Sequence, residues 1–205
     1  MGLQAKGLRE QECVALLSRN DIYISILGDA VTAAGAIFSG LPAGAKESEL
    51  IDCCTTAQVK WLFAMPGSVE HARSVARSSG VRDENVLVYD PPGFQAGSPD
   101  ESSQRGRLSS LLMQHDDGKY SNPNLSKDPS KHIVARFFTS GTTGASKAVD
   151  ISSSATIKRI ESHTLGDRAQ VAKKLHFIGM HHVSGTMTRQ QVCIAALPLN
   201  ASGGG

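Results

Sequence analysis

The sequence lacks both a large excess of one charge sign and a long uninterrupted apolar run. Lys and Arg total 21 against 19 Asp and Glu, which leaves a net charge of only +2. A nucleic-acid-binding domain usually presents a concentrated basic face, and a membrane-surface segment a polybasic patch. Because the basic residues of this chain are spread along its length, we predict no nucleic-acid partner. Small-molecule chemistry is the better expectation.

Cysteines are few, and they lack the spacing of a zinc site or a disulfide framework. The four residues Cys13, Cys53, Cys54 and Cys193 include no CxxC pair. A chain of 205 residues with 40% hydrophobic residues can bury a stable core without disulfide bonds. We therefore predict free thiols in a reducing compartment and no metal ligands.

The first twelve residues are charged and have no apolar stretch behind them, unlike a secretory signal. A cytoplasmic protein is expected, although a full-length relative could be peroxisomal. The most apolar segment, residues 22–38, is shorter than a comfortable membrane span and has Asp29 near its centre. Its small residues allow close packing, so we expect a helix buried on a sheet and no membrane span.

Short apolar runs alternate with helical patterns through the first half of the chain. Residues 13–17, 59–64 and 85–89 have the length and composition of buried strands. Residues 22–38 and 47–57 have helical patterns, with a stop at residues 39–42, and another helix starts after Ser68 and stops at Gly80. This alternation predicts an α/β fold with a parallel sheet covered by helices.

The expected organisation is a first α/β unit over residues 1–115, a linker over 116–131, and the start of a second unit over 132–205. The linker region is rich in Ser, Asp, Asn and Pro. In the second unit, residues 132–138 and 147–151 are expected to pair as a hairpin. A helix is expected over residues 154–163.

The tip of that predicted hairpin reads TSGTTGASK, a loop of glycines and hydroxyls that ends in a lysine. Gly141 and Gly144 let the backbone turn sharply, and consecutive N–H groups in such a turn form a concavity that suits an anion. Hydroxyl donors and one mobile positive charge complete what a triphosphate requires. The candidate contacts are Thr139, Ser140, Gly141, Thr142, Thr143, Gly144 and Lys147.

Composition alone leaves two interpretations of this loop equally open, because Gly, Ser and Thr also form ordinary polar hairpin tips without a ligand. The common phosphate motif GxxxxGK[ST] does not apply, because Gly144 is followed by Ala145 and Ser146 before Lys147. The order of the residues, and not their composition, must therefore distinguish the two interpretations.

The order T-S-G-T-T-G-x-x-K resembles the phosphate-binding signature of the adenylate-forming superfamily, which includes acyl-CoA synthetases, coumarate–CoA ligases, luciferases and the adenylation domains of peptide synthetases. The usual signature has proline and glycine where this chain has Ser146 and Ala148. The resemblance extends over most of residues 7–190. It implies that the chain is part of the N-terminal domain of an adenylate-forming enzyme.

The resemblance also implies a reaction. A carboxylate would attack the α-phosphate of ATP to give an acyl-adenylate and pyrophosphate, and coenzyme A would then take the acyl group. The loop would hold the terminal phosphates together with Mg2+, which is an electrostatic role, so no catalytic acid or base is assigned. The segment at residues 179–185 resembles the family's substrate-histidine motif, which would place His182 and Gly185 beside the acyl substrate.

Other parts of the family pattern do not appear in this sequence, including the Tyr-Gly-x-Thr-Glu segment near the adenine and the lysine of a mobile C-terminal domain. We therefore expect a truncated ligase fragment with little or no turnover by itself. The competing hypothesis is a non-catalytic nucleotide-binding or interaction module derived from such a ligase.

Overall fold

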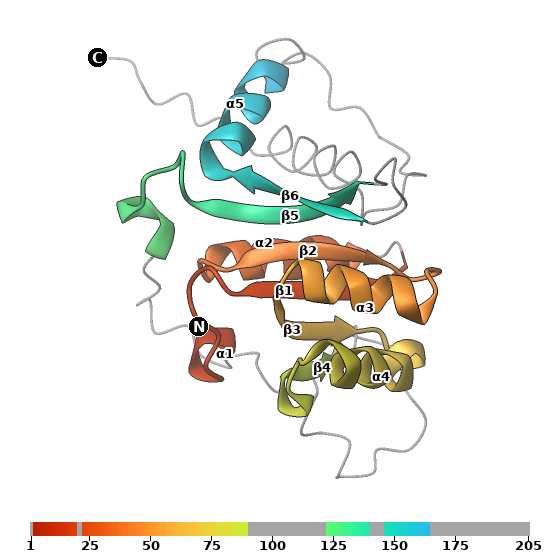
Figure 1. Cartoon of the computed structure of the whole chain (residues 1–205). Helices are drawn as coiled ribbons and strands as arrows, with labels where there is room; N and C mark the ends of the chain where they lie inside the picture. Colours follow the sequence, from red (N-terminus) through yellow and green to blue (C-terminus); the bar gives the residue numbers. More distant parts are fainter. Residues whose placement is uncertain (1, 20–21, 90–121, 140–145, 165–205) are drawn as a thin grey trace, which may run out of the picture.

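The computed structural model of the chain describes residues 2–19, 22–89, 122–139 and 146–164, and these residues form a six-stranded sheet flanked by helices (Figure 1). The strand order is β4-β3-β1-β2-β5-β6. All neighbouring pairs are parallel except β5 and β6, which form an antiparallel hairpin at one edge. The strands are β1 (Cys13–Ser18), β2 (Ile37–Pro42), β3 (Val59–Ala64), β4 (Val86–Val88), β5 (Ile133–Thr139) and β6 (Lys147–Ser152).

Helices cover both faces of the parallel part of the sheet (Figure 1). One apolar cluster joins α2 to one face through Ile24, Leu27 and Val31, while a second joins α3 and α4 to the other. The predicted α/β class with a mostly parallel, helix-covered sheet is therefore confirmed. The helices are α1 (Gly2–Ala5), α2 (Ile22–Ala33), α3 (Glu47–Thr56), α4 (Val69–Ser79) and α5 (Ser153–Thr164), with 3-10 turns η1 (Pro66–Ser68), η2 (Asp83–Asn85) and η5 (Pro123–Ser126).

The central strands are buried on both faces, which explains why they read as continuous apolar runs in the sequence. Every residue of β1 is buried, and β3 is buried at every position except Lys60. Successive side chains of a strand point to opposite faces, so Val14 and Leu16 enter the α2 cluster while Ala15 and Leu17 enter the α3 and α4 cluster. Strands of this kind require helices on both sides.

The prediction of a single helix over residues 22–38 was wrong at its C-terminal end. Helix α2 ends at Ala33, Gly35 follows with a left-handed φ of 81°, and β2 begins at Ile37. Glycine adopts this backbone conformation at little cost and is common just after helix ends. Residues 39–42, expected to be only a helix stop, belong to β2, and β2 lies beside β1 in the sheet.

The later predicted elements of the first unit match the structure closely. Strand β3 and helix α3 occupy the predicted ranges, and β4 lies inside its predicted range. Gly80 ends α4 in the left-handed conformation, with φ 78°. Ser68 is the N-cap residue of α4, but its side chain makes no capping hydrogen bond.

Strand β5 joins β2 with little backbone pairing, because Phe38 and Ala135 are the one registered pair. Gln11 supplements this contact with its side-chain amide. Its Nε2 donates to the Ile133 carbonyl at 3.0 Å, and its Oε1 accepts from the Ile133 N–H at 3.1 Å. The carboxamide of Gln11 thus pairs with Ile133 as another strand's peptide group would.

Strands from both predicted units lie in this one sheet, since β1–β4 fall within residues 1–115 and β5 and β6 within 132–205. The boundary at 116–131 stays a prediction. Within the ranges that the structure describes, no helix is both long and apolar enough to cross a membrane.

Candidate phosphate-binding site

The predicted loop connects the two strands of the edge hairpin. Thr139 is the last residue of β5 and is paired in register with Lys147, the first residue of β6. Because β5 is parallel to β2, its C-terminal end lies at the carboxyl edge of the sheet, where open α/β sheets usually bind ligands. The hairpin predicted from the sequence is confirmed by this pairing.

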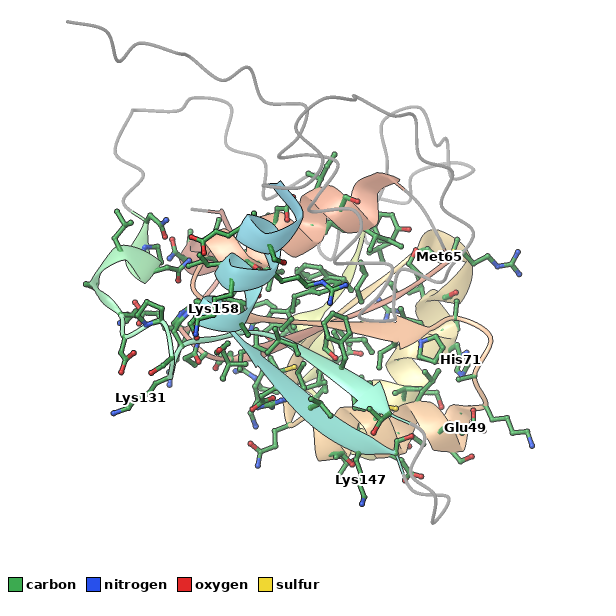
Figure 2. The ribbon with its side chains drawn as sticks, turned by 90° about the horizontal axis from the view of Figure 1, so that it is seen from above. Glu49, Met65, His71, Lys131, Lys147 and Lys158 are labelled. Atoms are coloured by element: carbon green, nitrogen blue, oxygen red, sulfur yellow. The ribbon has the colours of Figure 1, made fainter. Side chains whose placement is uncertain are left out.

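Thr139 and Lys147 are the two predicted contact residues that the structure describes, and both are exposed. Figure 2 shows the Lys147 side chain extending away from the ribbon on the side of α3, where Glu49 also lies. Among the described residues, no ion pair involves Lys147. Lys147 thus places an exposed ammonium group at the end of the hairpin.

The other predicted contacts lie outside the described residues. They are Ser140, Gly141, Thr142, Thr143 and Gly144 of the loop, and His182 and Gly185 of the expected acyl pocket. Their roles stay predictions.

The hairpin is tied to helix α3 below the loop by Arg136 of β5. Its Nε and Nη2 donate to the two carboxylate oxygens of Asp150 on β6, at 2.6 Å and 3.0 Å. Its Nη1 donates to the carbonyl oxygen of Ala57, the C-cap residue of α3, at 2.7 Å. The hydrogen bond to Asp150 also raises the pKa of Arg136.

Sequence reasoning missed Arg136 and Asp150, although a signal was present. A lone arginine inside the apolar run HIVARFF has to find polar partners when the strand is covered. The predicted hairpin places Arg136 directly opposite Asp150 once Thr139 is paired with Lys147, and the structure has this register. Cross-strand pairs of opposite charge stabilise such hairpins.

The cysteines near the hairpin are buried and poorly suited to nucleophilic or redox chemistry. Burial raises the pKa of Cys13 and of Cys54 to about 12, and it also raises the pKa of Cys53. A thiol reacts as its thiolate, which these environments disfavour near neutral pH. Cys13, Cys53 and Cys54 are free thiols packed in the sheet core.

The described side chains were compared with the ligand groups that metal ions use in proteins. No group of three His, Cys, Asp or Glu residues within them is arranged to hold an ion.

Comparison with known proteins gives the family. A family model described as AMP-binding enzyme matches residues 1–197, and the chain belongs to this family. Two relatives from Aspergillus niger, acyl-CoA ligase azaF and phenylacetyl-CoA ligase epaB, are each 32% identical over 152 residues, which is 73% of this chain and 27% of theirs. The chain thus spans about a quarter of the length of these curated relatives.

Solved structures show the same fold. ATP-bound MatB from Rhodopseudomonas palustris superposes with a TM-score of 0.73 at 22% identity, over 95% of this chain and 35% of MatB. The luciferase-like enzyme of the mealworm Zophobas morio gives a TM-score of 0.70 at 21% identity, over 93% and 42% of the two chains. The expected relation to the N-terminal domain of adenylate-forming enzymes is confirmed by the family match and these neighbours.

Proposed function

We propose that the segment from Thr139 to Lys147 binds the terminal phosphates of ATP, in a protein that activates a carboxylic acid for transfer to coenzyme A. The observation that carries this proposal is the hairpin register. Thr139 and Lys147 face each other at the carboxyl edge of the sheet, at the two ends of a segment rich in glycine and hydroxyls. Membership of the AMP-binding enzyme family and the similarity to two fungal CoA ligases support the same reaction class.

In this proposal the loop stabilises charge and does not transfer protons. Main-chain N–H groups and hydroxyls of residues 139–144 would donate to the β- and γ-phosphate oxygens, and the Lys147 ammonium would offset their negative charge. These contacts favour the departure of pyrophosphate when the carboxylate attacks the α-phosphate. His182 and Gly185 are proposed to lie beside the acyl group.

Mg2+ is proposed as the ion that accompanies ATP, held mainly by phosphate oxygens and water. No step is therefore assigned to a protein-bound metal. Coenzyme A is proposed as the acyl acceptor.

Calorimetric titration of the purified chain with ATP, pyrophosphate and AMP tests the binding site. We expect Lys147→Ala to weaken ATP and pyrophosphate binding by about tenfold or more, because it removes a charge-assisted contact to phosphate. AMP lacks the terminal phosphates and should bind equally to both proteins. The matched control is Lys158→Ala on α5, which removes another exposed lysine at a different place on the surface (Figure 2).

Two results would overturn the site assignment: no ATP binding by the unchanged chain, or equal losses for Lys147→Ala and Lys158→Ala. Equal losses would indicate general attraction to basic residues instead of a defined site.

Pyrophosphate exchange with a panel of carboxylic acids tests the reaction separately from binding. Exchange that depends on a carboxylate and on Lys147 would support adenylation by the chain itself. ATP binding without exchange would favour the competing hypothesis, a non-catalytic nucleotide-binding module.

A further inference from the structure

Arg136 joins three separate elements at one point. It lies on β5, hydrogen-bonds through two nitrogens to Asp150 on β6, and hydrogen-bonds through a third to the Ala57 carbonyl at the end of α3. Only 17% of its side chain is exposed. The guanidinium is planar and its donors have fixed directions, so three simultaneous bonds define both the position and the orientation of the group.

The position at the C-terminus of α3 suits this cation. The last carbonyl groups of a helix carry partial negative charge and lack partners within the helix. The Ala57 carbonyl accepts from Arg136 at 2.7 Å, so the arginine satisfies one of these groups while also pairing with Asp150. Helix and hairpin are thereby joined through one side chain.

The hydrogen bonds of Arg136 are important because backbone pairing between β2 and β5 does little to position the hairpin. Phe38 and Ala135 are the single registered pair between β2 and β5. Buried Val134, Ala135 and Phe137 hold β5 against the core, but apolar packing is not directional. Directional bonds are needed to set how the hairpin lies along α3.

We propose that Arg136 is a positioning residue for nucleotide binding, acting with Asp150 and the Ala57 carbonyl to hold Thr139 and Lys147 in place at the end of the hairpin. This inference rests on the proposed phosphate-binding function. Arg136 touches no phosphate itself. It acts by fixing the strands whose ends carry the contact residues.

The test compares Arg136→Lys with Arg82→Lys in the full chain. Lysine keeps the charge at 136 but cannot make the three directed bonds. The control is Arg82, an exposed arginine that pairs with Glu84 at 2.7 Å. It lies just before β4, at the edge of the sheet opposite the hairpin. Three quantities are measured for each variant: affinity for ATP, affinity for AMP, and amide hydrogen exchange in residues 133–139 and 147–152.

We expect Arg136→Lys to lower ATP affinity by about tenfold while AMP affinity stays unchanged, because only the terminal phosphates depend on the loop. Exchange in the hairpin should accelerate, whereas exchange in β1 and β3 should not. Asp150→Asn, which removes the charge but keeps the shape, should give the same pattern more weakly. A merely structural role would instead reduce both affinities in proportion to lost folded protein.

The outcomes separate this inference from the function on which it rests. If the unchanged chain binds no ATP, the proposed function fails, and nucleotide positioning fails with it. If ATP binds but Arg136→Lys binds it as tightly as Arg82→Lys does, the positioning role is overturned while the function stands. Unchanged exchange in the hairpin would show that the three bonds do not hold it.

Discussion

The parallel core and the edge hairpin are held together in different ways. Strands β1 to β4 lie between α2 on one face and α3 with α4 on the other, and their side chains form two continuous apolar clusters. In the hairpin, β6 has no fully buried residue, and the contacts of β5 and β6 with the core include the directed polar bonds of Gln11 and Arg136.

Because of this difference, substitutions in the hairpin can affect the candidate site without unfolding the core. The stabilisation from apolar burial is roughly proportional to the buried area. A substitution that leaves a cavity in the core therefore lowers the stability of the whole sheet. Directed polar bonds each contribute about 1 kcal/mol, so a substitution in them can shift the hairpin without unfolding the core. The candidate site lies at the end of the hairpin that these polar bonds join to the core.

At neutral pH, the largest effect is expected from a cavity in the core. Leu62→Ala removes a side chain with no exposed surface and should lower the free energy of unfolding by about 2–5 kcal/mol. Urea denaturation followed by the fluorescence of Trp61, the single tryptophan, measures the change. Val149→Ala in the hairpin is the control: that residue is 42% exposed, and the change should stay within about 0.5 kcal/mol. Equal losses would remove the distinction between core and hairpin.

Alkaline pH should weaken the core through its thiols. The pKa of Cys13 and of Cys54 is raised from 9.0 to about 12, so the unfolded chain loses these protons first as the pH rises. Stability is therefore fully present below pH 9 and falls between pH 9 and 12, by about 1.4 kcal/mol per pH unit for each thiol.

Comparing the unchanged chain with a Cys13→Ala and Cys54→Ala double variant isolates this contribution from other alkaline titrations. Urea denaturation at several pH values should give a shallower decline for the double variant, whatever its stability at pH 7. Parallel declines in the two proteins would contradict the assignment.

Loss of the Gln11 amide should loosen the hairpin selectively. Gln11→Glu replaces the Nε2 donor to the Ile133 carbonyl by an oxygen, which should cost about 1–2 kcal/mol. Amide hydrogen exchange should accelerate in β5 and β6 more than in β1. Gln58→Glu is a matched control, since Gln58 is exposed and has a similarly left-handed backbone, with φ 53° against 60° for Gln11. Equal acceleration throughout the sheet would show that β5 is not held separately.

The smallest expected effect is an increase in stability. Ser39 on β2 is fully buried, and its hydroxyl has no hydrogen-bond partner among the described residues. Ser39→Ala should therefore raise the free energy of unfolding by about 1 kcal/mol. Ser18→Ala should lower it, because the buried Ser18 hydroxyl is hydrogen-bonded to the Tyr89 hydroxyl at 2.5 Å. Thermal denaturation of both variants gives the comparison, and a loss for Ser39→Ala would count against an unsatisfied hydroxyl.

Much of the fold could be predicted from local patterns. Strands β1, β3 and β4, helices α3 and α4 and the β5–β6 hairpin follow from apolar runs and turn residues, because burial on both faces demands such runs. Strand β2 was missed because its residues Ser39, Gly40 and Pro42 are typical of turns. Gly35, which ends α2, was the signal for an earlier helix stop.

For the candidate site, the residue order of the loop and the hairpin around it could be predicted, but not what holds them in place. Gln11 and Ile133 are far apart in the chain, as are Ala57 and Arg136, and no local pattern links them. Such contacts exist only after the strands have packed.

The α/β class, most element boundaries and the phosphate-loop signature follow from local sequence patterns, because periodicity, turn chemistry and motif order are properties of neighbouring residues. Only the folded structure shows that the hairpin joins the same sheet as β1 to β4, and that Arg136 connects it to α3. Those facts depend on which distant groups satisfy one another's hydrogen bonds once water is excluded, which the order of residues alone does not specify.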